Sequence, residues 1–232
     1  MNFFADDPGN AMMELTRILH QLVEKPRGRY RCEDLVSAIA AFAGEACMRQ
    51  AAEFDCDNHR FAPGTPVFSQ KVNVVLSGDR CDWAQIPATS AFGRIFNMLT
   101  QHPDGPWSAD SFPDVAALYR RFAEARRGTA TRESFGKAPL SIPGKHFPVV
   151  PPLRAAHNLR CAVFARWPLA PEPAISVMAQ MVLLKILLTI RPHLDEHIAL
   201  TLALETMNAM AKTAPLLPAH MEESASEPAQ SA

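Results

Sequence analysis

Apolar side chains recur every three or four positions along most of this chain, which is the spacing of one face of an α-helix. This periodicity predicts helices over residues 10–24, 33–54, 90–101, 113–127, 153–167, 174–190 and 193–212. Segments that contain proline and glycine separate these stretches. Residues 67–76 are ambiguous, because Val72, Val74 and Val75 favour a strand. No partner strand is evident nearby, so we expect a helix there as well.

Composition agrees with the helical pattern. Alanine and leucine far outnumber valine and isoleucine in the 232 residues, and the 20 prolines separate or start the predicted helices. We therefore expect an all-α fold: a single bundle-like domain of about seven or eight helices over residues 1–213. Residues 128–152 should form a long proline-rich loop, and the acidic tail at 214–232, rich in Pro, Ser and Ala, should be disordered.

Two of the predicted helices have unusual surfaces. The helix over 33–54 is rich in alanine and contains Gly44, so another helix can approach it closely. Glu45 and Arg49 form an i,i+4 pair away from its apolar stripe, as on a helix surface.

The stretch 174–190 is apolar nearly all round, contains Lys185 and is at the lower limit of length for a membrane span. We expect it to be a central or interfacial helix, with no membrane partner.

Charge and cysteine content limit the partners and the compartment. The formal net charge of −1 lacks the basic excess of a nucleic-acid-binding protein, so no specific nucleic-acid partner is expected. The number of cysteines is odd and no C-x-x-C pair occurs, and the first residues lack a signal-peptide pattern. These features favour a soluble, cytoplasmic protein.

Cys47 and Cys161 lie on or near apolar helix faces, where inert core thiols are expected. Asp55 and Asp57 should disfavour the thiolate of Cys56.

The sharpest local motif is His193-Leu194-Asp195-Glu196-His197. It resembles the H-x-x-E-H motif of the inverted zinc peptidases, which implies that His193 and His197 share a metal ion and that Glu196 acts as a base. A third ligand would come from elsewhere, such as His157 or His146, because Glu205 lies about 12 Å further along the helix. The favoured alternative is one polar edge of an amphipathic helix that contains His193, His197, Thr201, Glu205, Asn208 and Lys212.

Three further patterns have both a functional and a structural interpretation, and we favour the structural one. A calcium loop starting at Asp55 fails, because His59 and Pro66 occupy the fifth and twelfth positions. Two basic patches suit an anion or acidic partner, or simply a solvated helix end: Lys25, Arg27, Arg29 and Arg31, and then Arg120, Arg121, Arg126, Arg127 and Arg132. Four methionines suit an adaptable pocket or the core: Met178, Met181, Met207 and Met210.

The function stays open, because the sequence contains no motif for a nucleophile or for phosphate binding. The first hypothesis is a non-catalytic module that binds a protein partner or forms a homodimer. The second is a metal-dependent enzyme that uses His193 and His197. The third is a helical domain that binds a small molecule in a pocket lined by Met and Phe side chains, with an arginine at its entrance. No cofactor is assigned.

Overall fold

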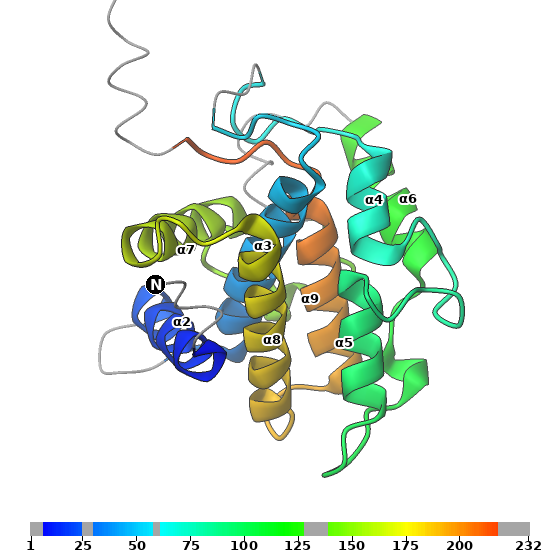
Figure 1. Ribbon diagram of the computed structural model, residues 1–232. Coiled ribbons are helices and arrows are strands. Elements are labelled where there is room, and N and C mark those ends of the chain that lie inside the picture. The colour runs from blue at the N-terminus through cyan, green and yellow to red at the C-terminus, as the bar shows by residue number, and fades with distance from the viewer. Residues whose placement is uncertain (1–6, 25–29, 58–60, 128–138, 218–232) are drawn as a thin grey trace, which may run out of the picture.

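Helices lie close to where the apolar periodicity predicts them (Figure 1). The computed structural model describes residues 7–24, 30–57, 61–127 and 139–217, and this part contains eight α-helices and no strand. The all-α prediction is confirmed, including a helix in the ambiguous segment. The helices are α2 (Pro8–Val23), α3 (Cys32–Ala51), α4 (Gln70–Ser77), α5 (Ala91–Thr100), α6 (Val115–Arg127), α7 (Pro152–Arg166), α8 (Glu172–Ile190) and α9 (Glu196–Met210), with 3-10 turns η1 (Ala109–Ser111) and η3 (Gly144–His146).

Side-chain caps decide where several of these helices begin. Ser90 accepts a hydrogen bond of 3.2 Å from the backbone N–H three residues further on and caps the start of α5. Ser69 caps α4 in the same way. Asp195 accepts a bond of 3.1 Å from the N–H three residues on, so α9 begins at Glu196 and the predicted start at His193 is wrong.

Helix α3 runs through the middle of the molecule, with α2, α4, α7, α8 and α9 packed around it (Figure 1). Every residue from Asp34 to Met48 is buried. A helix without a solvent-facing side has to be covered all round, so the other helices are arranged by their contacts with α3.

The predicted close approach occurs at Gly44, where α3 lies against α9. A Cβ atom added at Gly44 would lie 2.3 Å from the backbone carbonyl oxygen of Met207 and 3.0 Å from the backbone nitrogen of Ala211. A backbone cannot move aside as the end of a flexible side chain does. Glycine is therefore required for this helix–helix distance.

The Glu45–Arg49 pair forms, but its predicted place on the surface is wrong. Arg49 Nε donates to Glu45 at 2.9 Å, and only 8% of the Arg49 side chain and 4% of the Glu45 side chain are exposed. Arg160 of α7 also donates to Glu45, at 3.2 Å. Two further bonds of 3.0 Å join Arg160 to Glu172 at the start of α8. A charge in the interior needs charged partners, and this network therefore ties α3, α7 and α8 together.

Helix α8 lies in front of α3 and α9 in the view of Figure 1, with α2 and α5 on its two sides. Its length and composition would allow it to cross a membrane, and 61% of its most apolar 18-residue window is buried within the structure. The prediction of a core helix is confirmed on this inner side. Residues on the other side, including Val177 and Lys185, remain exposed.

The packed chain continues past the boundary predicted at residue 213. Ala214 and Pro215 are buried. The Ala214 N–H donates to the Thr65 carbonyl at 2.8 Å, and the Gly64 N–H donates to the Ala214 carbonyl at 2.8 Å. The disorder predicted for the rest of the tail concerns residues 218–232, which lie outside the described part of the chain.

Gly44→Ala should destabilise the protein by about 2–3 kcal/mol, because the new methyl group forces α3 and α9 apart. Urea unfolding measures the loss. The control is Gly9→Ala, whose added Cβ would lie 3.7 Å from Asp7 and should leave the stability unchanged or slightly higher. Equal stability of the two variants would contradict the close contact at Gly44.

Candidate functional site

The two predicted metal ligands lie around the start of α9 but do not share a helix face. His193 is exposed in the turn before the helix, and His197 is in its first turn. The His197 Nδ1–H donates to the Ser111 carbonyl oxygen at 3.0 Å. Glu196, the proposed base, instead accepts a hydrogen bond of 2.7 Å from Arg191.

The proposed third ligands have partners of their own. His146 Nδ1 lies 2.9 Å from a carboxylate oxygen of Glu33. The His157 Nδ1–H donates to the Leu216 carbonyl at 3.3 Å. Within the described ranges, no group of three or more His, Cys, Asp or Glu side chains is placed to hold a metal ion. Metal binding through His193 and His197 stays a prediction, which elemental analysis of untagged protein would test.

The polar edge predicted for the last helix exists, but most of it is buried: Thr201, Glu205, Asn208 and Lys212. Glu205 accepts hydrogen bonds from Arg121 of α6 and from the Ser141 hydroxyl. The Asn208 amide donates to a carbonyl of α6 at 3.4 Å. These contacts make the polar edge an interface with α6. Periodicity could not predict this, because it places residues on one face of a helix without showing what covers that face.

The cysteines are all free thiols, in contrasting surroundings. Burial raises the pKa of Cys47 and of Cys56 to about 11. Of the two aspartates predicted to act on Cys56, Asp57 adds to the increase in its pKa. Cys47 is the inert core thiol that the sequence indicates. The same prediction for Cys161 is wrong, because this thiol is exposed on α7.

The basic patches contribute two arginines that hold other parts of the chain. Arg31 donates to the carbonyls of Lys145 and Phe147 at 2.8 and 3.2 Å. Arg121 forms an ion pair with Glu205, whereas Arg120 is exposed. The other members lie outside the described side chains: Lys25, Arg27, Arg29, Arg126, Arg127 and Arg132.

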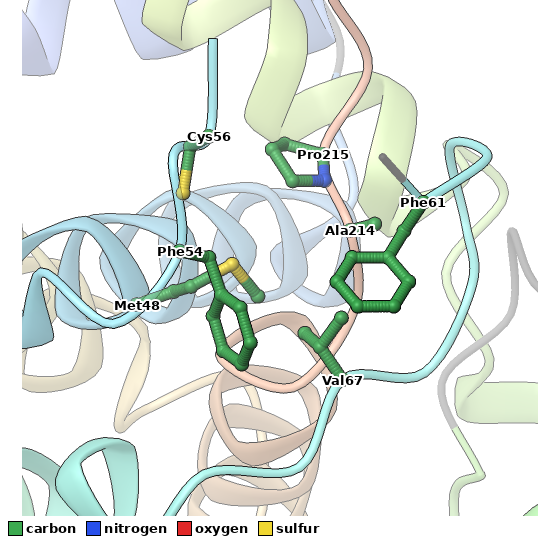
Figure 2. Close-up of a pocket in the computed structure, with 7 residues that line it drawn as sticks. All are labelled: Met48, Phe54, Cys56, Phe61, Val67, Ala214 and Pro215. Atoms are coloured by element: carbon green, nitrogen blue, oxygen red, sulfur yellow. The ribbon is translucent and has the colours of Figure 1, made fainter. Parts of the chain in front are cut away.

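Figure 2 shows a small pocket between the end of α3 and the C-terminal segment. The rings of Phe54 and Phe61 face it, together with Met48, Val67 and Pro215. The space between these side chains is too narrow to hold a water molecule. A space of this kind is a gap in the packing and does not form a ligand site.

A wider groove lies on the outward side of α8, between α2 and α5, and has a volume of about 430 Å³. Three methionines from three helices face it, namely Met12 of α2, Met98 of α5 and Met181 of α8. Met98 is 42% exposed. The remaining lining residues follow α5 and two turns of α8: His102, Leu184, Lys185, Leu188 and Thr189.

The groove combines an adaptable apolar surface with one formal charge. Methionine side chains are unbranched and polarisable, so they fit ligands of different shape. Lys185 is exposed and forms no ion pair with the part of the chain that the structure describes. No lining residue is acidic. The groove can therefore accept an apolar ridge with a carboxylate beside it.

The sequence identifies part of this groove. Of the four methionines considered for a pocket, Met181 lines it, whereas Met178, Met207 and Met210 are buried in the core. Met12 and Met98 are missed, because they lie far from α8 along the chain and only tertiary packing brings them together. No pattern along α2 or α5 marks these two methionines, because a helical period does not show what packs against each face.

Lys212, two residues after the end of α9, has a buried side-chain amine in an apolar environment. Its Nζ lies 3.7 Å from the centre of the Tyr119 ring and 5.9 Å from that of Phe122. Burial disfavours the ammonium form and lowers the pKa of Lys212 to about 7, against a weaker opposing effect of Cys81 and Asp79.

This environment predicts a specific pH dependence. Between pH 7 and about 10 the unfolded state retains a proton that the folded state has lost, so stability should rise with pH across this window. Lys212→Met should remove about 2 kcal/mol of the rise between pH 7 and 9, measured by urea unfolding at each pH. Lys185→Met, at an exposed position, is the control and should keep the rise. Identical pH profiles for wild type and Lys212→Met would contradict the prediction.

The chain matches no family model, no curated protein and no solved structure. The function is therefore inferred from the geometry of the groove.

Proposed function

We propose that this protein is a non-catalytic interaction module whose groove between α2, α5 and α8 binds an amphipathic helix of a partner protein. The observation that carries the proposal is that Met12, Met98 and Met181, from three helices, line one open apolar groove. Methionine-rich surfaces of this kind suit partners that present an apolar helix face.

The groove matches such a helix in length. Met181 and Leu188 lie seven residues apart on its floor, about 10 Å along α8. An amphipathic helix presents apolar side chains at i, i+3 or i+4, and i+7 over the same distance. The ridge of one helix can then pack into the groove formed by the others.

Charge favours a partner with an acidic residue beside its apolar ridge. Lys185 has no competing ion pair in the described chain, so a carboxylate of the partner gains a cation without displacing another anion. We infer a cytoplasmic location, where the free thiols stay reduced.

A small molecule is the second candidate ligand. The volume of about 430 Å³ lies within the range usual for small-molecule sites. The cation is then Lys185, in place of the arginine that the sequence suggested. A second copy of the chain is the third possible occupant and would make the protein a homodimer.

The test uses the full chain with ¹³C-methyl-labelled methionine and a synthetic amphipathic helix whose polar positions next to the apolar ridge are glutamates. We expect the methyl signals of Met12, Met98 and Met181 to shift. Met181→Glu should weaken binding about tenfold or more, because the new carboxylate lies in the apolar floor. Met13→Glu is the matched control, since Met13 is 59% exposed, outside the groove lining, and should not change the affinity.

Other outcomes would replace the proposal. Equal binding of a scrambled peptide, or equal loss in the two glutamate variants, would refute a specific helix site. Shifts of the same methyl signals with decanoate but not with peptide would assign the groove to a small molecule. Shifts that depend on protein concentration alone, with a dimer in light scattering, would assign it to a second copy.

A further inference from the structure

Cys161 and His157 lie one turn apart on α7, with the Cys161 sulfur 3.6 Å from His157 Nε2. Cys161 is exposed and His157 is half-buried. The pair lies outside both the groove and the α9 motif, and it combines a nucleophilic atom with a base within hydrogen-bonding distance.

A third group orients the histidine. His157 Nδ1 lies 3.3 Å from the Leu216 carbonyl oxygen. A carbonyl oxygen only accepts, so Nδ1 carries the proton of this bond. In the neutral ring, Nε2 then has the lone pair and faces the thiol of Cys161 as an acceptor. The C-terminal segment therefore holds the imidazole in the tautomer that a general base requires.

The thiol needs such a base. Partial burial and the carboxylate of Glu45 raise the pKa of Cys161, against a smaller opposing effect of Arg160. Few molecules therefore carry a free thiolate at neutral pH, and only the thiolate attacks a disulfide. Transfer of the proton to an imidazole already in contact removes this limitation during the reaction.

We propose that Cys161 and His157 form a site for reversible mixed-disulfide formation with small disulfides. His157 Nε2 takes the Cys161 proton while the sulfur attacks one sulfur of the disulfide. The new bond to Cys161 forms as the disulfide bond of the reagent breaks, and the departing thiolate takes the proton from the imidazolium. One disulfide is consumed and one thiol is released, so the exchange needs no other oxidant.

The chain offers internal controls for this site. Cys81 is also exposed, but no histidine contacts its thiol in the described part of the chain. Cys47 is fully buried and should react only if the protein unfolds. His157→Asn keeps an N–H donor near the Nδ1 position for Leu216 but lacks the Nε2 base. His197→Asn alters another ring whose Nδ1–H donates to a carbonyl, without a neighbouring thiol.

The experiment treats the reduced full chain with 2-hydroxyethyl disulfide, which is uncharged, between pH 6 and 8. Mass spectrometry follows the modification of each cysteine. At pH 7, Cys161 should react about tenfold or more faster than Cys81, with a shallow dependence on pH. In His157→Asn the rate at Cys161 should fall about tenfold and then rise tenfold per pH unit, as for an unassisted thiol. His197→Asn should leave the rate unchanged.

Two results would overturn the proposal: equal rates at Cys161 and Cys81 in the wild type, or an unchanged Cys161 rate and pH slope in His157→Asn. Protection of Cys47 in every variant verifies that the fold is intact while these rates are measured. If Cys47 becomes reactive in His157→Asn, His157→Gln is measured in its place, and an unchanged Cys161 rate there again refutes the proposal.

Discussion

The close contact between Gly44 and the backbone of Met207 sets the distance between α3 and α9, and the packing of the core around α3 depends on it. Without a side chain at position 44, α3 and α9 approach backbone to backbone, and α7 and α8 close the other sides of α3. Close packing and the removal of apolar surface from water stabilise this arrangement. It also brings Glu45 into the interior, which the structure permits because Arg49 and Arg160 both reach that carboxylate.

The same arrangement leaves one side of α8 uncovered. Its inner side lies against α3, and α2 and α5 flank it, so no described helix covers the outer side (Figure 1). Met181 and Leu188 consequently line a groove, although they belong to a helix that is apolar nearly all round. The free energy falls when a partner removes such an apolar surface from water. The packing of the core, which leaves this side of α8 uncovered, is thereby connected with the proposed binding role.

Two cysteines show how surroundings decide chemistry in this fold. Cys47 and Cys161 both lie within helices, but Cys47 faces α8, where Ser176 and Gln180 lie within 4 Å of its sulfur. Cys161 faces outward beside His157, whose orientation depends on a carbonyl 59 residues further along the chain. Burial makes the first thiol inert, whereas exposure and a fixed imidazole make the second a candidate nucleophile.

The sequence by itself determined the helices, the glycine at the close approach and the polar edge of α9, because periodicity, caps and small residues act over a few neighbouring positions. Only the tertiary structure decided which faces are covered. It buried the polar edge against α6, exposed Cys161 and removed His193 from the helix of His197. It also placed Met12, Met98 and Met181 around one groove. These outcomes depend on contacts between residues far apart in the chain, and a helical period carries no information about what packs against each face.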